Sequence, residues 1–522
     1  MKARNERSPR RTAGRGALLL GAAAMALSGC DLAPTYREPS YLLPSSYQGS
    51  GPFKLARPGD ALPRGPWWEL FGDPELDALE VRAVRDNPTL AAVAEQYTQA
   101  RDLAAEARSG LFPQVAADGT LSRSKRSQGR PYPGTAVGTN IATLNQIDGA
   151  ARWEPDFWSR IRNQTLLQKR LAQADAADLA SARLSLQAEL ATDFIAIRGL
   201  DTEIEVYKQS IGFYQKAVDI TRLRFLGKIS SGLDVARAES QLATTQALLT
   251  DTVANRAVLQ HAIAVLVGAD PSSFVVASGD VGRFAVPEVP VGVPSSLLQR
   301  RPDVAAAERR MAAANAAIGV SRAAFFPDIT LSAIGGFQDT GFDLASLPNS
   351  LWTVGATAFL PLFTGGLRRA ELQRSWSQFR QTRDDYRATV LGAFQEVEDG
   401  LTLTGQLSTE RAQQRTAVQA ALQAQNITLQ LYTGGLTNYL DAVVAQVTAL
   451  TARIAEVEVQ TRQLQASVTL VRGLGGGWTV GSLPTENGVL PFHPLAITGS
   501  DREPRPDGTG AGTEGASRPP GE

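Results

Sequence analysis

Few residues in this sequence have the types and spacing that catalysis or metal binding requires. Cys30 is the only cysteine, and the two histidines, His261 and His493, lie far apart with no metal-ligand spacing around either. Disulfides within the chain and cysteine-rich metal sites are therefore excluded. Residues 473–477 are glycine-rich, but they follow a predicted helix and precede Trp478, which favours a helix stop over a nucleotide-binding loop. We expect neither enzymatic activity nor a metal or dissociable cofactor.

The chemistry that the sequence does support is covalent modification of Cys30. A basic stretch is followed by an apolar run from Ala17 to Leu27, which suits a signal peptide and is too short for a stable membrane helix. The run ends in Leu27-Ser28-Gly29-Cys30, which resembles the lipobox of bacterial lipoproteins. That resemblance implies cleavage of residues 1–29 and a covalent lipid on Cys30. The alternative is an ordinary signal peptide with a chance cysteine.

Composition narrows the possible partners. Lys plus Arg and Asp plus Glu each number 52, so no net charge attracts nucleic acid, and we expect no nucleic-acid partner. With 43% hydrophobic residues in 522, the chain can bury a large core. Residues 481–522 are rich in Pro, Gly and charged residues, which predicts a disordered C-terminal tail.

Two copies of one unit organise the chain. Residues 87–113 match residues 301–327 without a gap, and each stretch ends in Phe-Pro. Two further blocks follow in the same order, in which Pro155, Phe157 and Arg162 correspond to Pro361, Phe363 and Arg368, and Phe225, Leu233 and Asp234 correspond to Tyr432, Leu440 and Asp441. Three blocks in the same order at similar spacing indicate a duplication.

Each unit is predicted to run helix, strand, turn, strand, very long helix, tight turn, helix. The first helices cover about 87–111 and 301–325, and Phe-Pro stops both. Alternating apolar residues then predict strands, as in Ile329, Leu331 and Ala333. From about 158 to 224, apolar residues recur every seven positions, which indicates supercoiling against neighbouring helices. A helix of that length is roughly 100 Å long and must line a fibre or a tube.

The same stretches carry a resemblance to a family. The carrying motifs are Ala33-Pro34-Thr35-Tyr36, Trp67-Trp68-Glu69-Leu70-Phe71, the two Phe-Pro blocks, Trp153-Glu154-Pro155-Asp156-Phe157-Trp158 and Pro361-Leu362-Phe363-Thr364-Gly365-Gly366. Over residues 30–480 the chain is similar to the outer-membrane factor family, the TolC-like efflux ducts, in the lipoprotein (NodT/OprM-like) branch of RND-type tripartite systems. Asp31, after the cysteine, is instead similar to an inner-membrane retention signal of enteric lipoproteins.

The resemblance implies a mainly α fold with a β-barrel part. Three protomers would share one long α-helical barrel and one twelve-stranded transmembrane β-barrel, with two tandem repeats per protomer. Open strand edges are not tolerated in lipid, so closure across a symmetric trimer is also expected on physical grounds. The predicted divisions are a signal peptide over 1–29, a lipid-anchored equatorial segment over 30–85, repeats over 86–295 and 296–480, and the tail over 481–522.

The resemblance places the functional residues at the two helical turns. It implies a periplasmic gate at Asp234, Tyr432, Asp441 and the position of Val444, where many relatives carry an acid. It also implies contact with a periplasmic adaptor through the turns, at Gly227, Lys228, Ser230, Gly434, Gly435 and Leu436. The alternative for both acids is that each only stabilises the start of the next helix.

The function implied is the outer-membrane exit duct of a tripartite efflux pump. It would conduct drugs or other small molecules passively from the periplasm, together with an adaptor and an inner-membrane RND transporter. Two alternatives stay open: the duct of a type I protein secretion system, and a lipid-anchored periplasmic coiled-coil scaffold without a pore.

Overall fold

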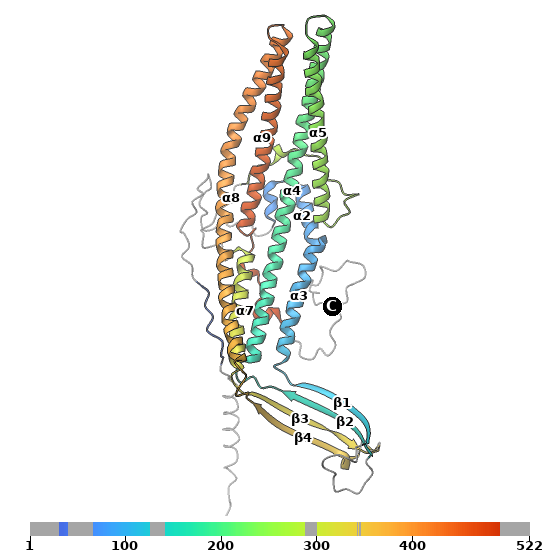
Figure 1. The fold of residues 1–522 in the computed structure, drawn as a ribbon, viewed down its shortest axis with the longest axis vertical. Helices are drawn as coiled ribbons and strands as arrows, with labels where there is room; N and C mark the ends of the chain where they lie inside the picture. Colours follow the sequence, from blue (N-terminus) through green and yellow to red (C-terminus); the bar gives the residue numbers. More distant parts are fainter. Residues whose placement is uncertain are drawn as a thin grey trace, which may run out of the picture.

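The computed structural model describes residues 31–39, 66–125, 141–287, 300–341, 343 and 346–490. They form a long, narrow protomer with a sheet at one end and the tips of two helical hairpins at the other (Figure 1). Cys30 and the predicted signal peptide lie outside the described residues. Within the described part, no helix is both long and apolar enough to cross a membrane. The same ranges contain no group of three or more side chains placed to bind a metal ion.

Each unit folds into the same order of elements. The first unit consists of α3 (Pro88–Ser109), β1 (Gln114–Lys125), β2 (Ile141–Trp153), α4 (Arg160–Leu226) and α5 (Gly232–Leu266). The second consists of α7 (Pro302–Ala323), β3 (Asp328–Asp339), β4 (Ser350–Phe359), α8 (Leu367–Thr433) and α9 (Tyr439–Gly473). The element order expected from the repeat is confirmed.

Local sequence sets the helix ends. Asn87 caps α3, because its side-chain oxygen accepts a hydrogen bond from the Leu90 amide at 2.8 Å, and Pro88 occupies the first helical position. The Phe-Pro pairs after α3 and α7 end those helices, since Pro disfavours helix at the preceding residue. The chain can then extend directly into β1 and β3.

The seven-residue apolar repeat of α4 forms the protomer's core. Leu190, Ile197, Ile204 and Val218 are all buried, which confirms the predicted stripe. The stripe packs against α9, and α7 packs against α4 nearer the sheet, around Ala177, so the second unit covers the first along most of its length. With 67 residues, α4 and α8 are each about 100 Å long at about 1.5 Å per residue.

The four strands form one antiparallel sheet in the order β1-β2-β3-β4. The centre of the sheet depends on glycine, because a Cβ on Gly336 would collide with the backbone of Ile147 and Asp148 on β2. The outer strands, β1 and β4, each pair on one side only. Most side chains of both outer strands are exposed in the single protomer.

A band of short elements surrounds the middle of α4. It contains η1 (Trp67–Phe71), α2 (Pro74–Asp86), and the loop after α5 with η2 (Val281–Arg283). Arg198 of α4 connects these pieces, because its guanidinium donates to Glu75 of α2 at 2.6 Å and to the Ala277 carbonyl at 2.5 Å. The band is therefore fixed to the long helix by buried, charge-assisted hydrogen bonds.

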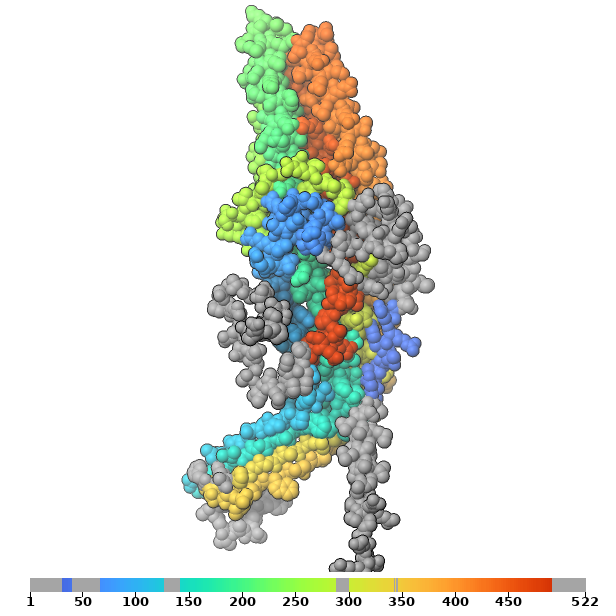
Figure 2. Space-filling model, turned by 180° about the vertical axis from the view of Figure 1, so that it is seen from behind, coloured from blue at the N-terminus to red at the C-terminus, as the bar shows by residue number. Residues whose placement is uncertain are grey.

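Two further segments lie on the outside of the helices, on the face seen in Figure 2. Residues 31–39 cross α7, where Asn315 donates to the Pro34 carbonyl at 2.7 Å and Arg322 to the Leu32 carbonyl at 3.0 Å. The carboxylate of Asp31 accepts a hydrogen bond from Asn163 of α4 at 3.0 Å. Asp31 therefore has a structural partner at the sheet end of the helices.

The second segment corrects a prediction. Residues 481–490 were expected to belong to a disordered tail, but they include the end of η5 (Val480–Ser482) and α10 (Glu486–Val489), which packs on α3 and α4. Val489 and Leu490 are buried there, and Arg101 donates to the Val489 carbonyl at 3.2 Å. The prediction was wrong because it followed the many Pro and polar residues of this stretch and gave no weight to the apolar Val489 and Leu490. Residues 491–522 lie outside the described residues.

Candidate functional site: the tips of the helical hairpins

The two hairpin turns have the same backbone geometry. The Ile229 amide donates to the Arg224 carbonyl, and the Leu436 amide donates to the Leu431 carbonyl, each at 2.8 Å. The turn residue with a left-handed backbone is Lys228 in the first hairpin, with φ of 59°, and Gly435 in the second, with φ of 76°. Lys228 is therefore strained at a position where the repeat has glycine in the other half.

The predicted adaptor-contact residues lie together at each tip. In the first turn Gly227 and Lys228 are exposed, and Ser230 is half-buried. In the second turn Gly434 and Gly435 are exposed, and the Leu436 side chain is 77% exposed. Leu226 and Ile229 of the first turn are also exposed, so each tip presents apolar side chains on a tight turn, beside Lys228 in the first. A contact with an adaptor stays a prediction.

The two predicted gate acids bond within their own turns. Asp234 forms a capping box with Ser231 at the start of α5, and its carboxylate accepts from the Ser231 amide at 3.4 Å. The Asp441 carboxylate accepts from the Thr437 hydroxyl at 2.5 Å, and the Asp441 amide donates to Asn438 at 3.0 Å. Both acids therefore support a helix start, which was the alternative interpretation. That geometry does not test a role in a gate.

Asp441 nevertheless has the exposure that a pore-lining acid needs. It lies in a groove between α8 and α9 together with Val444, whose side chain is 57% exposed. The rest of the groove is apolar or small, formed by Ala421, Ala424, Leu440, Ala445 and Thr448. Val444 adds no charge there, so Asp441 is the only carboxylate among the residues that line this groove.

Tyr432 lies at the contact between the hairpins and is only 3% exposed. Its ring packs against Tyr439 with centroids 5.2 Å apart, and the Arg224 guanidinium of α4 lies 4.8 Å from the ring centroid. Arg224 also donates to the Tyr432 carbonyl at 3.1 Å. Val218 and Ala238 of the first hairpin complete this cluster. One cation thus joins the two hairpins through both a π face and a carbonyl.

Electrostatics keeps both phenols neutral. Burial, with smaller contributions from the nearby Tyr432, Tyr214 and Asp234, raises the pKa of Tyr439 to about 12. Burial also raises the pKa of Tyr432, with Arg224 opposing this shift and Asp234 adding to it. Both rings therefore remain uncharged at any physiological pH, and the Tyr432 ring is a neutral partner for Arg224. Asp234 is close enough to act on both tyrosines, although its carboxylate accepts a hydrogen bond within its own turn.

A second contact joins the hairpins deeper along the helices. The Tyr214 hydroxyl of α4 donates to the Gln446 carbonyl of α9 at 3.2 Å. The sequence did not single out Arg224, Tyr214 or Tyr439. Arg224 was detectable in principle, because the repeat places it opposite Leu431, and a charge without a counterpart at a repeat position is a signal.

The model of the outer membrane efflux protein family matches residues 80–269 and 293–476. The chain belongs to this family. Pyoverdine export outer membrane protein OpmQ of Pseudomonas aeruginosa is 30% identical over 467 residues, which cover 88% of this chain and 97% of that protein. Antibiotic efflux pump outer membrane protein ArpC of Pseudomonas putida is 30% identical and covers 88% and 95%.

Solved structures agree with this family assignment. The outer-membrane channel OprN superposes with a TM-score of 0.79 at 27% identity, covering 86% of this chain and all of that one. The predicted fold class is confirmed: the efflux protein has the fold of the trimeric outer-membrane channels, with two tandem repeats in a mainly helical protomer. Its location is the bacterial outer membrane, with the helical part in the periplasm.

Proposed function

We propose that this efflux protein is the exit duct of an RND-type tripartite pump, which conducts small molecules passively and performs no chemistry of its own. The observation that carries the proposal is the incompleteness of the single protomer. Among the described residues, its sheet ends in unpaired β1 and β4, and its outermost helices, α3 and α8, each lack a neighbouring helix on one side. A closed duct needs those edges covered.

The internal repeat suggests what covers them. Within the protomer, Trp158 of the first unit stacks on Phe326 of the second, with ring centroids 4.7 Å apart. The corresponding stretch of the second unit includes Leu362 and Phe363, which are 91% and 90% exposed. A second copy of the chain would place its Phe112-Pro113 there, in the position of Phe326-Pro327. Repeating this contact through three copies closes a ring of six similar units.

The tips suggest how such a duct opens. Arg224 and the Tyr432–Tyr439 pair hold the two hairpins of one protomer together. An adaptor that binds the exposed turns more tightly when the hairpins are apart would shift the population toward the open state. The adaptor and the RND transporter are proposed partners, and a lipid on Cys30 is the proposed anchor.

Three Asp441 side chains around the axis would give the closed duct a cation preference. We test this with single-channel recordings of Asp441→Asn, using Asp270→Asn, a carboxylate remote from the tips, as the matched control. Asp441→Asn should lower the ratio of cation to anion permeability, while Asp270→Asn should leave it unchanged. Equal ion preference in wild type and Asp441→Asn would exclude a gate role for this acid.

The alternative functions predict different partners and different conductance for the protein. A type I secretion duct would cross-link in cells to an ABC-type exporter rather than to an RND transporter. A scaffold without a pore would pass no ions in a planar bilayer. Export of fluorescent dyes by cells that carry this duct, lost on its deletion, supports small-molecule efflux. The names of OpmQ and ArpC favour that class of cargo.

A further inference from the structure

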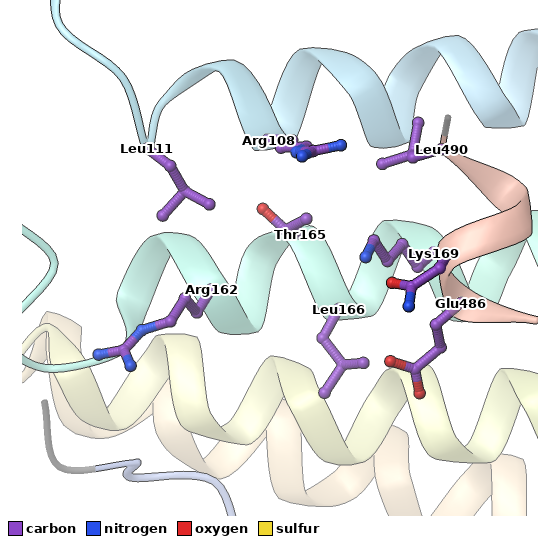
Figure 3. Close-up of a pocket in the computed structure, with 9 residues that line it drawn as sticks. Arg108, Leu111, Arg162, Thr165, Leu166, Lys169, Glu486 and Leu490 are labelled. Carbon is purple, nitrogen blue, oxygen red and sulfur yellow. The ribbon is translucent and has the colours of Figure 1, made fainter. Parts of the chain in front are cut away.

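A groove lies at the sheet end of the helices, between α3 and α4. Its volume is about 470 Å³, and α10 covers one end of it. Three basic residues, Arg108, Arg162 and Lys169, line it together with the apolar Leu111, Leu166 and Leu490. Figure 3 shows Arg108 and Lys169 coming from the two facing helices, with Thr165 between them. This groove takes no part in the gate described above.

One positive charge in the groove, that of Lys169, is not cancelled within the described residues. Arg162 is paired with Asp156, which accepts from its side chain at 3.2 Å, and its guanidinium points toward the start of α4 in Figure 3. Glu486, the one acid of the lining, forms an ion pair with Arg170 at 2.6 Å. Within the described ranges, no carboxylate pairs with Lys169. The groove therefore keeps positive charge beside an apolar wall.

The internal repeat shows what the corresponding place in the second unit holds. Arg101 corresponds to Asn315 and Arg108 to Arg322. Arg101 binds the Val489 carbonyl and Asn315 binds the Pro34 carbonyl, so a chain segment crosses both helix pairs at the same level. Arg322 then binds the Leu32 carbonyl, two residues from Cys30. In the second unit, the site that corresponds to the groove of Arg108 and Lys169 is thus occupied by the chain segment next to Cys30, the predicted site of lipid attachment.

We infer that this groove binds the phosphate of an anionic glycerophospholipid from the periplasmic leaflet of the outer membrane. Arg and Lys supply the hydrogen bonds and charge that a phosphate needs. Leu111, Leu166 and Leu490 supply apolar contact for the glycerol and the upper acyl chain, which inorganic phosphate would not use. The position fits, because Leu111 lies three residues before β1 begins at Gln114, at the level where the sheet enters the membrane. The inference rests on the proposed orientation of the duct.

The test uses the full chain in nanodiscs of phosphatidylcholine with one-fifth phosphatidylglycerol. The protein is then extracted in a mild detergent, and native mass spectrometry measures the lipids that it retains. Wild type should retain phosphatidylglycerol at least about fivefold above its share of the membrane. Lys169→Gln, and more strongly Arg108→Gln with Lys169→Gln, should lower retention to that share. Lys208→Gln is the matched control, because Lys208 is an exposed lysine on the same helix, far from the sheet.

Two further arms identify the source of the phosphate. If the apolar wall contributes to binding, inorganic phosphate at high concentration should displace only part of the lipid. Complete displacement would show that the groove binds only an ion, and would overturn the inference. A chain ending at Leu490 should retain as much lipid as the full chain. Retention by the shortened chain alone would show that residues 491–522 fill the groove, and would also overturn it.

The same nanodisc preparations are tested for conductance after transfer to a planar bilayer. Lys169→Gln should conduct like wild type, so that loss of lipid is separated from loss of the pore. If the wild type conducts but retains no excess phosphatidylglycerol, the inferred lipid site is contradicted and the proposed duct is not. A wild type that does not conduct would contradict the proposed function instead.

Discussion

Arg224 contributes more to the contact between the hairpins than either predicted gate acid. It donates to the Tyr432 carbonyl and lies over the Tyr432 ring, whereas Asp234 and Asp441 accept hydrogen bonds within their own turns. A partly buried cation–π contact and one hydrogen bond from a charged donor contribute about 2–5 kcal/mol in total.

Arg224→Gln should therefore raise the open probability of the duct, because the closed arrangement loses that stabilisation. Single-channel recording without an adaptor measures it. Arg222→Gln provides the control, since Arg222 is an exposed arginine of the same helical turn whose ion pair with Glu239 at 2.5 Å stays within one hairpin. A similar open probability in Arg224→Gln and wild type would show that the contact does not hold the tips closed.

Glu80 of α2 gives the stability of the protein a pH dependence. Its side chain is fully buried, both carboxylate oxygens lack a hydrogen-bond partner among the described residues, and burial raises its pKa to about 9, with Asp77 adding to the shift. The folded state thus holds a proton that the unfolded state releases above its ordinary pKa of 4.5. Its contribution is complete below that value and is lost as pH rises toward 9.

Glu80→Gln should remove this dependence. The melting temperature of wild type should fall between pH 5 and pH 9 relative to the variant, by an amount equivalent to a few kcal/mol, on the order of 1.4 kcal/mol per pKa unit. Glu69→Gln, which changes an exposed acid of the neighbouring η1, should follow wild type. Parallel melting curves for Glu80→Gln and wild type across that range would contradict a neutral buried Glu80.

At the scale of elements, the second turn needs glycine at only one of its two adjacent glycine positions. Gly435 has φ of 76°, whereas Gly434 beside it has φ of −74°. Gly435→Ala should destabilise the second tip by about 1–2 kcal/mol, and Gly434→Ala should have a much smaller effect. Hydrogen exchange of the amides of residues 429–441 measures both. Equal protection in the two variants would show that the turn does not need a left-handed backbone.

The elements themselves were largely predictable from sequence. The stripe through Leu190 and Ile197 and the Phe-Pro stops fix α3, α4 and α7 locally, so their ends were found within a few residues. The path of residues 31–39 and of α10 was not predictable. Both are held by contacts such as Asn315 with the Pro34 carbonyl, between residues far apart in the sequence. The Arg224 contact escaped prediction for the same reason.

At the scale of the whole molecule, the repeat predicts the contact between protomers. Phe363 is exposed in one protomer, whereas its counterpart Phe157 is half-buried and precedes Trp158, which stacks on Phe326 of the second unit. Phe363→Asp should weaken assembly, because a charge would have to enter an apolar contact. Sedimentation in detergent should show smaller species for it. Leu347→Asp, in the connection between β3 and β4, is the control and should assemble normally, and full assembly of Phe363→Asp would place that side chain outside the interface.

The central claim is that one chain carries a third of a duct. The most direct test combines the mass of the purified mature protein in detergent with its conductance in a planar bilayer. Three chains per particle, together with discrete cation-preferring channel openings from the same fraction, is the predicted result. A monodisperse single chain that passes no ions would contradict it, whatever the state of the tips.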